Sequence, residues 1–368
     1  MRTIFGLFMI LHGLISLLGF IKAFGIAEVD QLTRTISEPA GLFWLIASLL
    51  FLISGGLFFN EQSWWWMAVL PGILILQVLI FMYWQDAKWG TILNVIILAG
   101  CLLGYGNWDF QAMIEREKDS FFYRQSKEPR KVKKDQIAGL PPIVQLWMGN
   151  SGMTGIERIN SIHFRQKGTM KTSPEGSWMP VEAEQYVKTV SPGYLWIADV
   201  EAAPYINLSG RDKYVDGRGH MLLKLLSLVP VADAKGKEID QGSLLRYLGE
   251  MVWYPGAALE PYVRWDEVDD TRAKVTMSFG DITASGIFEF NKMGDPLRFE
   301  AERYYDRKEG ATLETWVVDI GAGSFKTFDG LRVPTVAKVT WKLAGGDFTW
   351  YKLEISDLKY NYTHHSSS

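Results

Sequence analysis

The chain has 368 residues, a net charge of −3 at neutral pH and 48% hydrophobic residues, a hydrophobic share that is high for one soluble domain. This charge gives no reason to expect a nucleic acid as partner, because binding a polyanion requires a concentrated basic surface. The single cysteine, Cys101, excludes an intramolecular disulfide and a zinc site built on several thiolates.

Four apolar stretches at the start of the chain are predicted to cross a bilayer as helices. They run from Ile4 to Phe24, Gly41 to Phe59, Trp64 to Trp84 and Gly90 to Tyr105. Each is close to the roughly 20 residues that a helix needs to cross the hydrocarbon layer. The first is longer than the apolar run of a secretion signal, so we interpret it as an uncleaved helix. Short loops after the second and third spans make neighbouring helices antiparallel, which predicts an α-helical four-span membrane bundle over residues 1–108.

A few polar residues lie inside these spans, chiefly His12, Gln77 and Asn94. Such side chains face other helices or water rather than lipid. They are expected either to form hydrogen bonds that fix the bundle or to make a proton relay or ligand site at mid-depth. No predicted span has a charged residue at its centre, which argues against a pump or an ion channel.

The distribution of basic residues predicts the orientation in the plasma (inner) membrane. Both chain ends lie on one side of a four-span protein, and that side has Arg2 and the basic stretch after the last span. The other side has Lys22, Arg34 and Lys88. Basic residues near span ends favour the cytoplasmic side. The count therefore places the second domain in the cytoplasm, and an error of one span would reverse this prediction.

Residues 109–139 are predicted to form a basic connector next to the membrane. A run of basic residues in this position is attracted to anionic lipid headgroups by about 1 kcal/mol per base. The alternative is a solvated linker that only stops translocation. The bases concerned are Arg124, Lys127, Arg130, Lys131, Lys133 and Lys134.

Residues 140–362 are predicted to form a soluble, mainly antiparallel β domain, with residues 363–368 as a disordered tail. After a short helix ending near Met148, apolar residues alternate with polar ones. Ile162, Phe164 and Met170 fall on one face of a strand, while His163 and Arg165 fall on the other. The same alternation returns several times between turn signals, which predicts nine to eleven strands of antiparallel sheet with one wet face.

One helix interrupts the strands. Asp240 is the expected N-cap, and Leu244, Leu248 and Met251 form an apolar stripe at helical spacing. Pro255 prevents the helix from continuing. A curved sheet, or half-barrel, covered by such a helix encloses an apolar space that either fills with side chains or holds a ligand.

Several short motifs resemble an uncharacterised bacterial family whose soluble domain is similar to the half-barrel of LolA-type lipoprotein carriers. In the soluble half these are Arg165-Gln-Lys-Gly-Thr-Met170, Gly210-Arg-Asp-Lys-Tyr214, Arg246-Tyr-Leu-Gly-Glu250, Val252-Trp-Tyr-Pro255 and Trp341 to Leu343. In the membrane half they are His12-Gly-Leu-Ile15, Lys22-Ala-Phe-Gly25 and Gln85-Asp-Ala-Lys88 followed by Gly90-Thr91. The resemblance implies an apolar groove under a helical lid that could take acyl chains, and it implies no activity.

The sequence shows no convergent set of groups for catalysis, and no metal or cofactor is expected. His163 and His220 are interpreted as exposed or hydrogen-bonded histidines, and Glu300 and Glu302 as surface charges. The one cluster that could form a site is Arg246 and Glu250, spaced four apart on the helix, with Trp253 and Tyr254 beside them. A salt bridge that holds the helix on the sheet would explain the same residues.

These patterns favour a membrane-anchored domain that binds a lipid or the acyl part of a lipidated partner. The predicted groove-lining residues are Ile162, Phe164, Met170, Leu244, Leu248 and Met251. An enzyme acting on envelope lipids through the Arg246 and Glu250 helix is the first alternative. A structural interaction module without a ligand is the second.

Overall fold

A computed structural model describes residues 2–123 and 131–364. Chain contacts divide it into two compact units: residues 1–113 with 226–228, and residues 114–225 with 229–368. The two units are described separately. The domain limits predicted at residues 108, 139 and 362 stay predictions.

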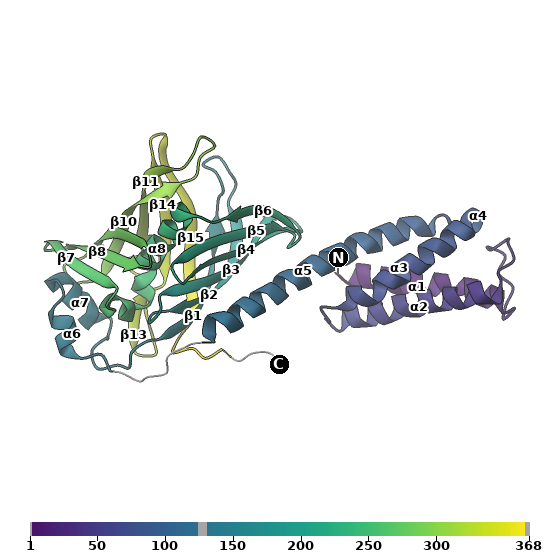
Figure 1. Ribbon diagram of the computed structural model, residues 1–368, viewed down its shortest axis with the longest axis horizontal. Helices are drawn as coiled ribbons and strands as arrows, with labels where there is room; N and C mark the ends of the chain where they lie inside the picture. The colour runs from purple at the N-terminus through teal and green to yellow at the C-terminus, as the bar shows by residue number, and fades with distance from the viewer. Residues whose placement is uncertain (1, 124–130, 365–368) are drawn as a thin grey trace. The chain divides into compact units, whose positions relative to one another are not determined.

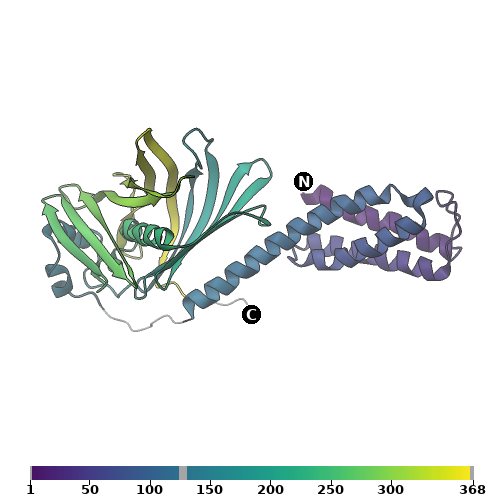
Figure 2. The same cartoon turned by 45° about the horizontal axis from the view of Figure 1, so that its top comes forward.

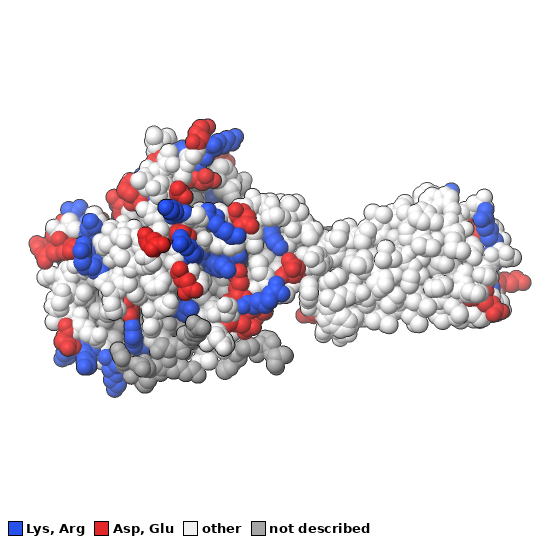
Figure 3. Space-filling model, viewed as in Figure 1, with Lys and Arg blue, Asp and Glu red and all other residues white. Residues whose placement is uncertain are grey.

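The first unit is a bundle of helices, and the prediction of four apolar helices is confirmed. Four helices, α1, α2, α3 and α5, are long and apolar enough to cross a membrane (Figure 1). Ser37 caps the start of α2 through its side chain, which accepts from the amide of Ala40. Most of the bundle face seen in Figure 3 has no charged side chain. The helices are α1 (Arg2–Ala23), α2 (Glu38–Phe59), α3 (Trp65–Met82), the short α4 (Trp84–Ala87) and α5 (Gly90–Phe122).

Helix α5 continues well beyond the end of the fourth predicted span at Tyr105, as far as Phe122. The added turns are rich in Glu, Arg and Lys, which favour a helix as strongly as apolar residues do, so the loss of hydropathy did not mark the helix end. Within the second unit, the last turns of α5 lie on the outer face of the sheet. Phe121 packs with Tyr186 and Leu195. Glu117 forms ion pairs with Arg211 at 3.1 Å and Lys213 at 2.7 Å.

The second unit is built on one 13-stranded sheet, in the order β6-β5-β4-β3-β2-β1-β15-β14-β11-β10-β9-β8-β7. Every neighbouring pair is antiparallel, and β12 and β13 form a separate pair. The strands are β1 (Ser161–Met170), β2 (Met179–Lys188), β3 (Gly193–Ala203), β4 (Ile206–Val215), β5 (Arg218–Leu225), β6 (Val229–Ala234), β7 (Val263–Asp269), β8 (Arg272–Phe279), β9 (Ile282–Phe290), β10 (Pro296–Tyr305), β11 (Thr312–Ile320), β12 (Phe325–Phe328), β13 (Leu331–Pro334), β14 (Val336–Leu343) and β15 (Gly346–Tyr360).

The sheet curls around helix α8 (Lys237–Gly249), which lies against its concave face (Figure 2). This helix joins the two edge strands β6 and β7, followed by the 3₁₀ turns η1 (Glu250–Trp253) and η2 (Pro255–Leu259). Gly219 on β5 lets α8 approach closely, because a β-carbon at this position would lie 2.4 Å from the Ser243 hydroxyl oxygen. The predicted fold class, a membrane bundle followed by a curved antiparallel half-barrel with a covering helix, is confirmed.

Two details of the sequence prediction are wrong. The described chain has 15 strands instead of nine to eleven, because several strands follow each other through tight turns that the apolar pattern did not separate. Helix α8 starts at Lys237, and its N-cap is Gly236, whose φ of 123° a glycine adopts without strain. Asp240 lies inside the helix, where its carboxylate accepts a hydrogen bond from the Gly219 amide at 2.7 Å.

Two short helices, α6 (Lys134–Ala138) and α7 (Pro142–Asn150), complete the second unit and extend its apolar core. The predicted helix near Met148 is confirmed by α7. Trp147 on α7 packs against Trp265, Phe288 and Phe290 with ring centroids 5.8–6.1 Å apart. The core therefore fills the closed part of the curved sheet with aromatic side chains, with α8 at its centre.

Candidate functional site

The predicted groove-lining residues lie in the protein core. Ile162, Phe164, Leu244, Leu248 and Met251 are all 0% exposed. They pack α8 onto the strands that it covers, so a ligand could reach them only if α8 moved. Met170, at the end of β1, is half-buried. The role of these residues in ligand binding stays a prediction.

Arg246 on α8 lies over the concave face and is held by three partners. It donates to Asp212 Oδ2 at 2.7 Å, to Glu250 Oε1 at 2.7 Å and to Gln185 Oε1 at 3.0 Å. Its guanidinium also stacks over the ring of Tyr194 at 4.8 Å. Although burial opposes the charge, the nearby carboxylates hold the pKa of Arg246 well above its ordinary value. The ion pair expected between Arg246 and Glu250 is therefore present, with Asp212 as a partner that the sequence did not reveal.

Trp253 and Tyr254 do not form an aromatic rim beside this ion pair. Trp253 is 3% exposed and packs edge-on against Phe164 at 5.4 Å. Tyr254 is 0% exposed and donates to the carbonyl of Tyr247 at 2.8 Å. Both follow the end of α8 at Gly249, where the 3₁₀ turns redirect the chain into the core.

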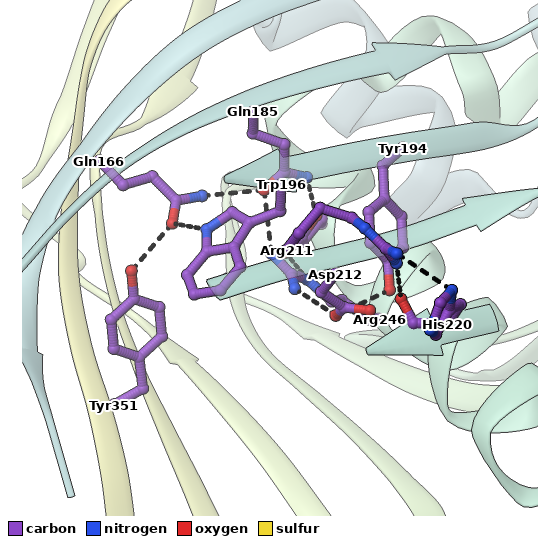
Figure 4. A network of polar contacts seen from close by, with 10 residues as sticks. Gln166, Gln185, Tyr194, Trp196, Arg211, Asp212, His220, Arg246 and Tyr351 are labelled. Carbon is purple, nitrogen blue, oxygen red and sulfur yellow. Dashed lines mark hydrogen bonds and ion pairs between the residues drawn. The ribbon is translucent and has the colours of Figure 1, made fainter. Parts of the chain in front are cut away.

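A chain of hydrogen bonds extends from Arg246 across the concave face (Figure 4). Gln185 donates to Glu250 at 2.5 Å and accepts from Gln166 at 3.0 Å. The Gln166 side-chain oxygen in turn accepts from the Trp196 indole at 2.9 Å and from the Tyr351 hydroxyl at 2.9 Å. This network joins β15, β1, β2, β3, β4 and α8 in fixed positions, as buried polar groups with all partners in place do.

Arg303 on β10 is the second guanidinium of the concave face. It stacks over the rings of Trp316 and Trp341, with centroids 4.8 Å and 5.8 Å away. Gly242 on α8 leaves room for it, since a β-carbon there would lie 3.0 Å from Arg303 Nε. Burial lowers the pKa of Arg303, although a guanidinium stays protonated in proteins. Among the described residues, no acceptor forms a hydrogen bond or an ion pair with this half-buried side chain.

Apolar side chains continue the concave face beyond this polar group. The strand register places Val181, Val200, Leu208 and Leu225 in one row, directly opposite one another across β2 to β5. Val181 and Val200 are buried, whereas Leu208 and Leu225 are half-buried. On the other half of the sheet, Tyr305 of β10 packs against Trp341 of β14 with ring centroids 5.0 Å apart, and it is half-buried too. The concave face thus combines two guanidinium groups with partly accessible apolar surface.

The sequence contained a signal for Arg303 that the predictions did not use. Phe299 and Ala301 alternate with the surface residues Glu300 and Glu302, so they belong to the core face, and Arg303 continues this face. Gln166 follows Ile162 and Phe164 in the same way on β1. Polar residues at core positions of an alternating strand are therefore the signal that points to this site. The pairing of Asp212 with Arg246 joins β4 and α8, and no local pattern could indicate it.

The two histidines interpreted as non-catalytic lie outside this site. His163 stacks against Tyr186 at 4.7 Å, is buried, and has no hydrogen-bond partner for either ring nitrogen among the described residues, so its interpretation as exposed or hydrogen-bonded is wrong. His220 Nε2 lies 2.8 Å from Asp233 Oδ1, and His220 Nδ1 lies 3.1 Å from Arg211 Nη2. Burial lowers the pKa of His220. Glu300 and Glu302 are exposed, as predicted for surface charges.

The polar residues predicted inside the membrane half are brought together. His12 Nε2 lies 2.9 Å from Asn94 Oδ1, Asn94 donates to Gln77 at 3.0 Å, and Gln77 donates to Thr91 at 3.1 Å. These bonds connect α1, α3 and α5. Whether these hydrogen bonds only stabilise the bundle or also orient a ligand site depends on the partner of the second ring nitrogen of His12, Nδ1.

Part of the predicted basic connector borders a cavity of about 650 Å³ in the second unit. Lys131 and Lys133 line it, together with the ion pair of Arg158 and Glu260. Lys134 begins α6. Arg124, Lys127 and Arg130 lie outside the described residues. The contact of these bases with anionic headgroups stays a prediction.

The fold and the site define a class of protein: a half-barrel with a covering helix, preceded by four helices able to span a membrane. The chain belongs to the family of unknown function DUF6920, whose model matches residues 138–360. This confirms the resemblance to an uncharacterised family. No curated protein matches the chain.

Two solved structures are similar to the chain. One is a putative outer membrane lipoprotein-sorting protein domain from Vibrio parahaemolyticus, with 11% identity and a TM-score of 0.33, covering 56% of this chain and 87% of that one. The other is a DUF1329 family protein from Desulfovibrio piger, with 11% identity and a TM-score of 0.35, covering 63% of this chain and 92% of that one. Likenesses of this size say nothing about what this chain binds.

Proposed function

We propose that the concave face of the half-barrel binds the acyl group of a lipid or of a lipidated protein. In this proposal Arg303 donates to the carbonyl oxygen of the ester or amide that carries the acyl chain. The acyl chain lies along the half-buried apolar side chains of the concave face, among them Leu208, Leu225 and Tyr305. The observation that carries the proposal is a half-buried guanidinium that lies over the rings of two tryptophans and has no acceptor among the described residues.

Arg303 is half-buried, and none of its nitrogen atoms is among the buried polar atoms without a partner, so water can reach them. An apolar chain lying on the concave face would exclude this water, and a buried donor left without a partner costs about 1–3 kcal/mol, and more when it is charged. A ligand oxygen that accepts from Arg303 avoids this cost, whereas the neighbouring Arg246 already has its carboxylate partners Asp212 and Glu250. The two arginines and two carboxylates balance each other in charge. A neutral acyl linkage therefore fits the site better than a phosphate, which would add an unbalanced negative charge.

Binding fits the site better than catalysis. A general base needs a carboxylate or histidine that is free to accept a proton from the reacting group. The two carboxylates of the network, Asp212 and Glu250, both accept hydrogen bonds from Arg246. The Glu250→Gln variant separates the two alternatives, because a binding protein keeps its ligand whereas an enzyme that uses Glu250 loses its turnover.

A titration of the full chain with a fluorescent acyl probe tests the proposal. The probe is a medium-chain fatty acid methyl ester with a fluorophore at the chain end. Arg303→Met should weaken its binding about tenfold, the effect of losing about 1.4 kcal/mol. Arg298→Met is the matched control, since Arg298 lies on the same strand and is paired with Asp319 on the opposite face. Equal affinity in the two variants would exclude Arg303 as the ligand-binding group.

The proposed binding domain is attached to the membrane by the apolar helices of the first unit. Such attachment would keep it close to lipids and to lipidated proteins. The cytoplasmic location of this domain rests on the count of basic residues alone and stays part of the proposal. Accessibility of an introduced surface cysteine to a membrane-impermeant thiol reagent in intact cells would determine the side.

A further inference from the structure

The membrane bundle contains a cavity of about 400 Å³, separate from the site proposed in the half-barrel. Its walls are mostly apolar and come from α1, α2, α3 and α5. At one end it is bordered by Gln31 and Leu32 of the loop between α1 and α2, and by Asp86 of α4. Asp86 fastens this loop by accepting from the Thr33 amide at 2.8 Å and from its hydroxyl at 2.7 Å. All of these residues belong to the first unit.

Two buried polar atoms on the cavity wall have no partner in the described part of the chain. They are the Nδ1 atom of His12 and the indole Nε1 of Trp44. His12 is 3% exposed and Trp44 is 5% exposed, and both side chains line the cavity. Buried polar groups without a partner are rare in native proteins, and each one calls for an explanation. A ligand in the cavity would satisfy both.

The hydrogen bonds of the polar cluster determine whether the Nδ1 atom of His12 donates or accepts a hydrogen bond. Asn94 donates through its amide nitrogen to Gln77, so its oxygen faces His12 and can only accept. His12 Nε2 must therefore carry a proton, and in the neutral imidazole Nδ1 is an acceptor. Trp44 Nε1 can only donate. A ligand that satisfies both atoms needs a donor group near His12 and an acceptor oxygen near Trp44.

The positions of the two groups indicate an elongated molecule. Trp44 packs on Gly19, where a β-carbon would lie 2.4 Å from its ring. Gly19 and His12 are seven residues apart on α1, which corresponds to about 10 Å along a helix. The remaining walls include Ile15, Leu76 and Leu93, and none of the residues that line the cavity is a lysine or an arginine. An anionic headgroup would have no counter-charge there, and the one carboxylate of the lining, Asp86, is engaged by the amides of Thr33 and Arg34 and by the Thr33 hydroxyl, so the lining favours a neutral ligand.

We propose that this cavity binds a neutral, largely apolar molecule from the membrane that carries a hydroxyl group at one end and a carbonyl or hydroxyl oxygen at the other. The hydroxyl donates to His12 Nδ1, and the oxygen at the other end accepts from the Trp44 indole. The cluster of His12, Asn94, Gln77 and Thr91 positions the histidine, since the bond of Nε2 to Asn94 leaves Nδ1 as the remaining acceptor of a side chain that lines the cavity.

Photolabelling of the full chain in lipid nanodiscs tests this proposal. The probe is a methyl hydroxydecanoate that carries a diazirine in its chain, and the matched probe has the hydroxyl group converted to a methyl ether. Labelled peptides are identified by mass spectrometry. The proposal predicts that peptides with Leu76 and Leu93 are labelled by the hydroxyl probe about tenfold more than by the ether, the difference expected for one hydrogen bond formed in a low-dielectric site.

Two variants test whether Trp44 and His12 contact the ligand. Trp44→Phe keeps the ring and removes the N–H, and should reduce labelling by about fivefold to tenfold. Trp66→Phe is the matched control, because its indole N–H is also buried without a partner but does not line the cavity. His12→Phe removes the Nδ1 acceptor together with the donor to Asn94, and should abolish the preference for the hydroxyl probe. Equal labelling by the two probes, no labelling, or equal effects of Trp44→Phe and Trp66→Phe would overturn the proposal.

Discussion

Arg303 and Arg246 show how two identical side chains on one face acquire different roles. Arg246 is held by Asp212, Glu250 and Gln185, so its donors are occupied and it fixes α8 to the sheet. Arg303 stacks over Trp316 and Trp341 and forms no hydrogen bond or ion pair with the described residues, so its position is fixed while its donors stay available. Stacking suits a guanidinium better than an ammonium group. Arg303→Lys should therefore weaken ligand binding almost as much as Arg303→Met.

The ion pair of Arg246 and Glu250 should contribute to stability as a coupled unit. Glu250→Ala leaves a buried guanidinium with one carboxylate fewer, and we expect it to lower the free energy of unfolding by about 3 kcal/mol. Arg246→Leu combined with Glu250→Ala should cost less than the sum of the two single variants, because the double variant removes both charges of this pair and only Asp212 loses a partner, as it does in Arg246→Leu alone. Thermal denaturation of the four proteins measures this coupling. Strictly additive effects would contradict it.

The carboxyl group of Glu184 on β2 predicts that the stability of the half-barrel depends on pH. The nearby His163, whose Nε2 lies 3.9 Å from Glu184 Oε2, and a hydrogen bond from the Tyr186 hydroxyl lower the pKa of Glu184 from 4.5 to about 2, against the opposing effect of burial. A carboxylate with a lowered pKa in the folded state stabilises the fold above its unfolded pKa. This stability is lost as the pH falls from about 4.5 to about 2. Glu184→Gln should therefore be less stable at pH 7 and should lose less stability over this range.

Acid denaturation followed by tyrosine and tryptophan fluorescence measures the effect of Glu184→Gln. Glu182→Gln is the control, since Glu182 lies on the same strand with 73% of its side chain exposed. It should keep the acid sensitivity of the natural protein. A variant at Glu184 with an unchanged acid transition would show that this carboxylate has no special partners in solution.

At the scale of elements, α8 determines which part of the concave face stays open. It packs in the closed part of the sheet, and the close approach at Gly219 sets its depth. Gly219→Ala would place a methyl group 2.4 Å from Ser243 Oγ and 2.8 Å from the carbonyl oxygen of Ile239. We expect this overpacking to cost about 1–3 kcal/mol, with a lower Tm and faster proteolysis of α8. Gly345→Ala, where nothing lies within 4 Å, should have no effect.

The elements that the sequence predicted well are those with a strong periodicity. The four spans, the alternating strand β1 and the apolar stripe of α8 follow directly from the spacing of apolar residues. The end of α5 was missed because its charged turns are still good helix formers. The start of α8 was missed because Asp240, a good N-cap residue, serves instead as a partner for the Gly219 amide. Such a choice depends on a strand far away in the sequence.

At the scale of the whole molecule, the chain combines a hydrophobic bundle with an antiparallel half-barrel, and a neutral amphiphile is proposed for each. Their chemistry differs: Arg303 offers donors only, whereas the bundle cavity offers one donor and one acceptor. The candidate site could be predicted only in part from the sequence. The location on the concave face and the pair of Arg246 and Glu250 followed from periodicity, whereas the partners from β3, β4, β10 and β15 required the strand order.

Native mass spectrometry of the full chain, released from a mild detergent after purification from its membrane, tests the central claim most directly. The account predicts that the natural protein retains an acyl-bearing molecule of discrete mass, which organic solvent removes. It also predicts that Arg303→Met loses this mass while Arg298→Met keeps it. A natural protein without any such added mass, or the same added mass on both variants, would contradict the claim that Arg303 and the concave face bind an acyl group.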